Sequence, residues 1–152
     1  MKLLLPLALT EPRAFTDAVQ AFADRVGAEV FALHVTAPIP GAPYGLTEGA
    51  LGFEGSPYVL YDPTLQRDLE RAEGAAFHFF LTERFPRPVR AALRTGMAAE
   101  TILADADTLR PDFIALGHRR HGFLDRLLAG SVTRAVLERA RCPVVSFPIA
   151  DA

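Results

Sequence analysis

Two apolar stretches near the amino terminus decide the fold: Lys2-Leu3-Leu4-Leu5-Pro6-Leu7-Ala8 and Glu29-Val30-Phe31-Ala32-Leu33-His34-Val35. The first is apolar at nearly every position, and a strand without alternation belongs inside a sheet that is covered on both faces. Between the two stretches, apolar side chains recur at helical spacing until Gly27. Thr10 is the expected N-cap of this helix, with Glu11 in its first turn. A strand, a helix and a second strand in this order predict parallel pairing with a right-handed crossover.

The remaining residues continue this alternation. Further strands are predicted over about residues 89–93, 113–116 and 144–147, the second of them ending at Gly117. Further helices are predicted over about residues 62–82, around residues 102–109 and from Ser131 onward. Strands that alternate with helices in this way predict an α/β fold, a single three-layer α/β/α domain over residues 1–152. Its sheet is expected to be five-stranded and mostly parallel.

The predicted helix over residues 62–82 has an apolar face. That face is expected to contain Leu65, Leu69, Ala72, Ala76 and Phe80, widened by Phe77 and Phe79. Before this helix, residues 36–58 are rich in proline and glycine and predict a long loop. A loop of this length is either a lid or binding loop or a tolerated insertion, and both alternatives stay open.

The composition excludes several functional classes. The 152 residues are 50% apolar and 22% charged, with a formal net charge of −2. That balance excludes disorder and provides no global field to hold nucleic acid or a membrane surface. No apolar run approaches the ~18–20 residues of a membrane-spanning helix, and the first strand is not followed by a secretory cleavage pattern. We therefore expect a cytoplasmic protein without nucleic-acid or membrane partners.

The segment after the fourth predicted strand is the most informative about function. It reads Gly117-His118-Arg119-Arg120-His121-Gly122-Phe123-Leu124-Asp125-Arg126-Leu127-Leu128-Ala129-Gly130-Ser131. In open parallel sheets, ligands sit beyond the carboxyl ends of the strands. Gly117 allows a tight turn there, and Gly130 opens a helix whose free N–H groups and positive dipole end suit an anion. Ser131 is expected to cap that helix. Phosphate is the predicted ligand.

This segment resembles the nucleotide-binding fingerprint of the universal stress protein family: glycine, two residues, glycine, nine residues, glycine, then serine or threonine. Gly117 and Gly130 take the first and third glycine positions, and Ser131 follows. The resemblance spans essentially the whole chain. It implies the adenine nucleotide alpha hydrolase-like fold with strand order 3-2-1-4-5, frequent dimerisation and a role in stress survival or regulation.

One branch of this family binds ATP, and the resemblance carries a candidate site over to this chain. The site consists of Val35 near the base and Gly117, Arg120, Gly130, Ser131 and Val132 around the phosphates. Mg²⁺ is a candidate companion of ATP. Two positions depart from the family: its aspartate two residues after the first-strand proline is Ala8 here, and its second loop glycine is Arg120. Arginine either blocks phosphate or grips it with paired hydrogen bonds, and both alternatives stay open.

The leading interpretation is a cytoplasmic stress-response protein that binds an adenine nucleotide and acts on an unidentified protein partner. The rival is a family member that has lost ATP, because of Ala8 and Arg120, and acts as a dimeric interaction protein. Catalytic turnover is not expected beyond a slow ATPase, since the sequence offers no positioned general base. Under both interpretations, residues 143–149 form an edge strand and predict a homodimer across a two-fold axis.

Other chemistry-bearing residues have structural interpretations. His34 and His78 lie in apolar runs and are expected to be partly buried and hydrogen-bonded. Cys142 is expected to be a small buried hydrophobe. Asp105 and Asp107 cannot share one helix face, so a paired acid and base is not expected. The basic cluster at residues 118–121 lacks an accompanying carboxylate or cysteine at ligand spacing, so no metal site is predicted.

Overall fold

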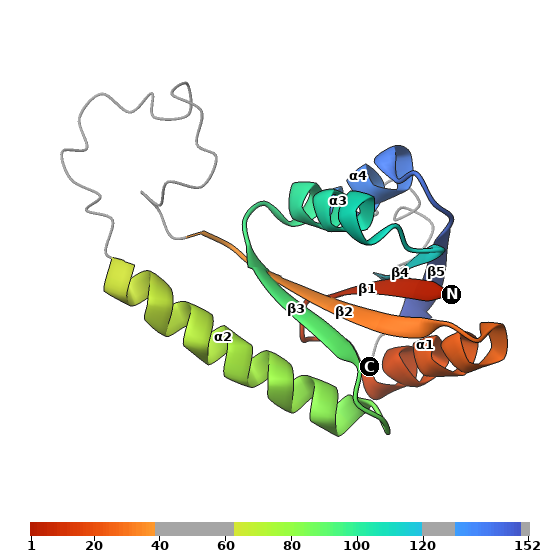
Figure 1. Cartoon of the computed structure of the whole chain (residues 1–152), viewed down its shortest axis with the longest axis horizontal. Helices are drawn as coiled ribbons and strands as arrows, with labels where there is room; N and C mark the ends of the chain where they lie inside the picture. The colour runs from red at the N-terminus through yellow and green to blue at the C-terminus, as the bar shows by residue number, and fades with distance from the viewer. Residues whose placement is uncertain (39–62, 120–129, 150–152) are drawn as a thin grey trace.

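The computed structural model describes residues 1–38, 63–119 and 130–149, which form a three-layer sandwich (Figure 1). Its elements in chain order are β1 (Lys2–Leu7), α1 (Arg13–Val26), β2 (Glu29–Thr36), α2 (Pro63–Arg84), β3 (Arg90–Thr95), α3 (Ala98–Leu109), β4 (Phe113–Arg119), α4 (Ser131–Arg139) and β5 (Val144–Ile149). The described strands pair in parallel, in the order β3-β2-β1-β4-β5. Figure 1 shows α1 and α2 on one face of this sheet and α3 and α4 on the other. The predicted fold class and strand order are confirmed.

Helix α1 ends where predicted but begins later. Gly27 adopts the left-handed conformation (φ 66°), and its N–H points to the carbonyls of the last helical turn. At the other end, Pro12 is the N-cap, and no side chain caps the helix among the described contacts. The prediction of Thr10 as N-cap is therefore wrong, and Glu11 lies outside the first turn. Pro12 explains the shift, because the helical conformation is disfavoured for the residue before a proline, which keeps Glu11 outside the helix.

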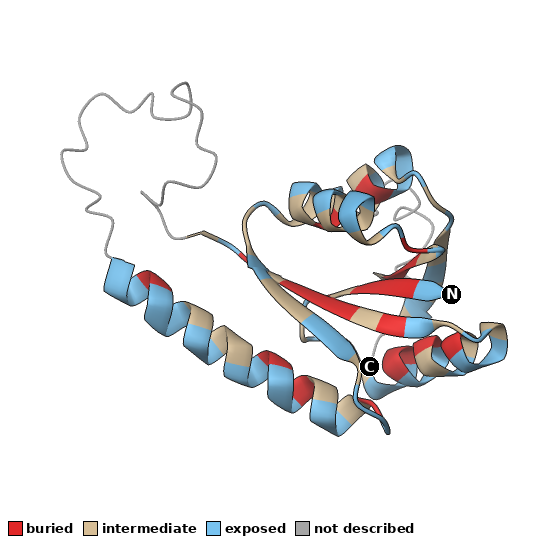
Figure 2. Cartoon of the chain, viewed as in Figure 1, coloured by how far each residue is buried: buried red, intermediate tan, exposed pale blue. Residues whose placement is uncertain are grey.

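Each face of the sheet buries its own apolar cluster, and β1 contributes to both. The cluster under α1 and α2 includes Leu3, Leu5, Phe15, Val19 and Ala115. The cluster under α3 and α4 includes Leu4, Leu33, Ile102, Ile114 and Val136. Figure 2 shows buried residues concentrated on the central strands. The uninterrupted apolar pattern of β1 thus reflects a strand that is covered on both sides, as predicted.

The apolar face predicted for α2 is confirmed at Phe77 and Phe80 and is wrong at its other members. Phe77 and Phe80 are buried, whereas the side chains of Leu65, Leu69 and Phe79 are 50%, 42% and 67% exposed. Ala72 and Ala76, the other members of the predicted face, are exposed as well. None of the described helices, the 22-residue α2 included, is long and apolar enough to cross a membrane.

Polar contacts explain the orientation of α2. Gln66 is 4% exposed, and its Nε2 donates to Glu70 Oε1 over 2.8 Å. The Thr95 hydroxyl at the end of β3 donates to the same carboxylate oxygen over 3.1 Å, and it lies 3.0 Å from the Thr36 hydroxyl at the end of β2. Because the ends of β2 and β3 present hydroxyl groups, the first half of α2 packs Glu70 there, while Phe77 and Phe80 are its buried side chains farther along and its leucines stay exposed.

Strand β4 continues two residues beyond its predicted end, to Arg119. Gly117 is therefore a strand residue that pairs with Phe147, and the predicted tight turn at Gly117 is wrong. A Cβ atom at Gly117 would lie 2.5 Å from Ile149 Cδ1 and 3.2 Å from Phe15 Cε2. Close packing of β5 and α1 around β4 explains why this strand position is a glycine.

Candidate functional site

The carboxyl ends of β2, β1 and β4 lie side by side at one edge of the sheet. In a parallel sheet this edge is the usual location of ligands. The structure brings five of the predicted site residues to this end of the molecule: Val35, Gly117, Gly130, Ser131 and Val132. Arg120 lies outside the described residues, as do His121 and residues 39–58 of the predicted long loop.

The predicted site residues do not all face the same layer. Val35 and Val132 pack against the apolar cluster under α3 and α4. A side chain at Gly117 would instead point toward Phe15 and Ile149, on the α1 side of the sheet. The structure thus gives Gly117 a packing role between β5 and α1. A contact between phosphate and the backbone of Gly117 stays a prediction.

The amino end of α4 has the features of an anion site. Gly130 is the N-cap (φ −47°), and no side chain caps the helix among the described contacts. The predicted capping role of Ser131 is therefore wrong, since Ser131 is the first helical residue and is exposed. Among residues 1–38, 63–119 and 130–149, no atom would lie within 4 Å of a Cβ atom at Gly130. The first N–H groups of a helix have no partner within the helix, which makes its amino end favourable for a negatively charged ligand.

An exposed ion pair joins α4 to α3. Arg139 donates through Nη1 and Nη2 to the two carboxylate oxygens of Glu100, over 2.5 Å and 2.8 Å. The hydrogen bonds from this guanidinium lower the pKa of the Glu100 carboxyl below its ordinary value. A bidentate pair fixes orientation as well as distance, so it holds the helix that carries the candidate anion site.

His34, at the end of β2, is 7% exposed and links β1 to α2. Its Nδ1 donates to the carbonyl of Leu7 over 2.8 Å, and its Nε2 lies 2.9 Å from Glu73 Oε2. Because a carbonyl oxygen can only accept, Nδ1 carries a hydrogen atom. The prediction of a buried, hydrogen-bonded histidine is confirmed for His34, whereas His78 is exposed and the prediction there is wrong.

The loop after β1 carries a carboxylate that the sequence pattern assigned to a helical turn. The N–H of Ala8 donates to Glu11 Oε1 over 2.7 Å. Between them, Leu9 adopts φ 67°, which is uncommon for a residue other than glycine. Glu11 Oε2 is buried and has no hydrogen-bond partner among the described residues. The sequence could have indicated this carboxylate, because an acidic residue stands three positions after Ala8.

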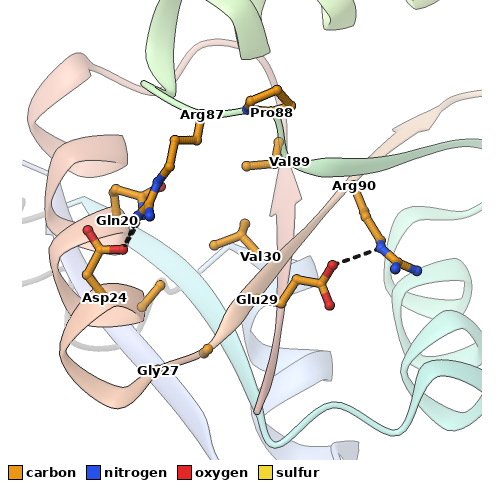
Figure 3. A pocket seen from close by; sticks show the side chains of 11 residues that line it. Gln20, Asp24, Gly27, Glu29, Val30, Arg87, Pro88, Val89 and Arg90 are labelled. Carbon is orange, nitrogen blue, oxygen red and sulfur yellow. Dashed lines mark hydrogen bonds and ion pairs between the residues drawn. The ribbon is translucent and has the colours of Figure 1, made fainter.

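A pocket of about 580 Å³ lies at the opposite end of the sheet, where the strands begin (Figure 3). It is lined by the end of α1 and the starts of β2 and β3. Asp24 pairs there with Arg87, and Arg90 Nε donates to Glu29 Oε1 over 2.8 Å. These side chains are all at least half exposed, and ligands of parallel sheets bind at the other edge. We therefore centre the candidate site on the carboxyl edge.

Cys142, Asp105 and Asp107 have surroundings that favour structural roles over chemical ones. Burial raises the pKa of the Cys142 thiol, which disfavours the reactive thiolate. Asp105 pairs with Arg94 over 3.3 Å and Asp107 with Arg141 over 3.5 Å, so the two carboxylates have separate partners. Within residues 1–38, 63–119 and 130–149, no group of three or more His, Cys, Asp or Glu side chains is arranged to hold a metal ion.

The likeness to known proteins extends over nearly the whole chain. A sequence model of the Universal stress protein family matches residues 5–148. The chain belongs to the universal stress protein family. A relative from Thermus aquaticus, "Universal stress protein in QAH/OAS sulfhydrylase 3'region", is 31% identical over 126 residues, which cover 83% of this chain and 82% of the relative. The resemblance of this universal stress protein to its family, first indicated by Gly117, Gly130 and Ser131, is confirmed.

Solved structures agree with this membership. A universal stress protein in complex with cAMP aligns with a TM-score of 0.56 at 13% identity, covering 98% of this chain and 97% of the other. A universal stress protein family protein from Arabidopsis thaliana with AMP bound aligns with a TM-score of 0.56 at 18% identity, covering 98% and 92%. At such identities the likeness shows the fold of this universal stress protein, which is adenine nucleotide alpha hydrolase-like.

Proposed function

We propose that this universal stress protein is a cytoplasmic stress-response module that binds an adenine nucleotide at the carboxyl edge of its sheet. The main support is the amino end of α4, where Gly130 is the N-cap and no side chain of the described residues caps the helix. The phosphates would lie at this helix start, and Val35 would lie nearer the base. Relatives of the same fold that hold cAMP or AMP give the proposal further support.

Calorimetric titration would measure binding of ATP, AMP and cAMP to the wild-type chain, with and without Mg²⁺. We expect at least one of these three nucleotides to bind. Ser131→Glu is expected to weaken that binding by more than about tenfold, because it adds negative charge where phosphate would bind. The same charge favours the start of a helix, so the variant should fold. Ala98→Glu is the matched control, because Ala98 is the first residue of α3, as Ser131 is of α4.

The rival function, an interaction protein without a nucleotide, is favoured by Ala8 and Arg120. The double change Ala8→Asp, Arg120→Gly restores both family residues and separates the two functions. Binding by the restored chain alone would contradict the proposed function and support the rival. If wild type binds the nucleotide and Arg120→Ala abolishes this binding, Arg120 would be the residue that holds the phosphate.

We further propose that the protein is a homodimer through β5. Within the described sheet, β5 has β4 as its neighbour on one side and is the edge strand on the other. Phe147 packs inward against Phe15 and Phe22, so the partner would meet the strand backbone. Sedimentation velocity at micromolar concentration is expected to show a dimer, and a monomer alone would contradict this proposal.

A further inference from the structure

The His34 ring lies between two groups that can each only accept a hydrogen bond. Its Nδ1 is 2.8 Å from the carbonyl oxygen of Leu7, and its Nε2 is 2.9 Å from Glu73 Oε2. A neutral imidazole has one N–H, an imidazolium has two, and an ionised carboxylate has no hydrogen to donate. The two contacts together therefore need one hydrogen more than a neutral ring and an ionised carboxylate hold.

The surroundings favour the ring as the carrier of this additional hydrogen. The side chain of Glu73 is 44% exposed, so water stabilises its carboxylate in the charged form. The side chain of His34 is 9% exposed, and a charge at such a buried position needs a charged or hydrogen-bonded partner. The carbonyl of Leu7 and the carboxylate of Glu73 provide both. An imidazolium beside an ionised carboxylate therefore satisfies every atom in this cluster.

The other titratable groups toward this end of the surrounding elements are engaged elsewhere. Glu70, one turn earlier in α2, accepts hydrogen bonds from two other side chains. Glu11, in the loop after β1, accepts the N–H that follows that strand. Arg94, in β3, pairs with Asp105 of α3, which covers the other face of the sheet (Figure 1). Glu73 is thus the charged group that His34 contacts directly.

We propose that His34 is an imidazolium that holds α2 to the end of β1 through Glu73, and that loss of its proton loosens this helix. When the pH rises and the ring gives up one hydrogen, one of the two contacts places an acceptor against another acceptor. The stabilisation is therefore present at lower pH and is lost as the pH rises. The joint between α2 and the sheet is a pH-sensitive device, and it does not depend on the proposed nucleotide site.

Nitrogen NMR of the His34 ring tests its charge directly. Ring nitrogens with and without a bound hydrogen resonate in separate ranges, and correlations from the ring to the backbone of the same residue assign the two signals. At about neutral pH, we expect hydrogen on both Nδ1 and Nε2 of the wild-type chain. An Nε2 signal in the range of nitrogens without hydrogen would place the additional hydrogen on Glu73 and would overturn the proposal.

Glu73→Gln tests the pH dependence of the joint. The glutamine amide can donate to Nε2 while Nδ1 still donates to Leu7, so a neutral ring satisfies both contacts in this variant. The folding equilibrium constant of wild type, divided by that of Glu73→Gln, is expected to fall by about fivefold or more between about pH 6 and about pH 9. Urea denaturation measures both constants, and their ratio cancels the groups that titrate alike in the two chains.

Glu83→Gln is the matched control, because it removes the same charge from an exposed position of the same helix. The corresponding ratio for this variant is expected to change by less than about twofold over the same pH range. A ratio for Glu73→Gln that is equally insensitive to pH would overturn the proposed device. Failure of the chain to bind any nucleotide would leave this inference standing.

Discussion

Phe15→Ala is expected to lower the free energy of unfolding by about 3–5 kcal/mol. Phe15 is 2% exposed, and its ring meets Phe147 edge-on, with centroids 6.1 Å apart and an interplanar angle of 88°. Its removal leaves a cavity between α1 and β5, because β5 is held in the sheet by β4 and cannot move to close the gap. Urea denaturation followed by circular dichroism measures the loss.

Phe79→Ala is the matched control for this substitution. Phe79 is 67% exposed on α2, so its truncation is expected to change the free energy of unfolding by less than about 0.5 kcal/mol. Similar losses for the two phenylalanines would show that α2 buries the stripe that contains Leu65 and Leu69. That result would contradict the described orientation of this helix.

Gly117→Val is expected to lower the free energy of unfolding by about 1–3 kcal/mol, through overpacking. The added Cβ would lie 2.5 Å from the end of the Ile149 side chain and 3.2 Å from the Phe15 ring, and valine adds two further methyl groups. The end of Ile149 can move aside, but the ring belongs to the core. The same denaturation experiment measures this loss.

Gly130→Ala is the control for Gly117→Val, because it adds a side chain at the other glycine of the family motif, where packing is not tight. No described residue lies within 4 Å of a Cβ atom at Gly130, and the N-cap position disfavours alanine only modestly, by less than about 1 kcal/mol. Losses of the same size at both glycines would contradict a packing role for Gly117. A clear difference would show that two glycines of one motif are present for different physical reasons.

These two glycines bear on how the family motif works in this chain. Gly130 is the N-cap of α4 and brings no side chain to the helix start, which leaves its first N–H groups to an anion. Gly117 lets β4 approach Ile149 and Phe15, which positions the strand end next to that helix start. One glycine would thus act on the ligand directly, and the other would act by placing the elements around it.

Much of the fold could be predicted because it depends on local pattern. The apolar run of β1 belongs in a strand covered on both faces, and Gly27 ends α1 because glycine adopts φ 66° without strain. Ser131 begins α4 as predicted, although it does not cap the helix. In each of these cases, the residues that form the feature are close together in the sequence.

Packing between distant residues settled the rest. The first half of α2 could have buried its leucines, but Glu70 contacts the Thr95 hydroxyl, which lies beside that of Thr36, and the apolar burial of this helix begins only at Phe77. From the sequence, Gly117 was predicted to be a turn residue. In the structure it is a strand residue that packs closely against Ile149 and Phe15. Periodicity says which side chains share a helix face, and it carries no information about what a neighbouring strand presents to that face. For that reason the strands and the end of α1 followed from the pattern of amino acids, and the strand order from the resemblance to the family, while the full buried face of α2 and the unpartnered oxygen of Glu11 depended on how the chain folds back on itself.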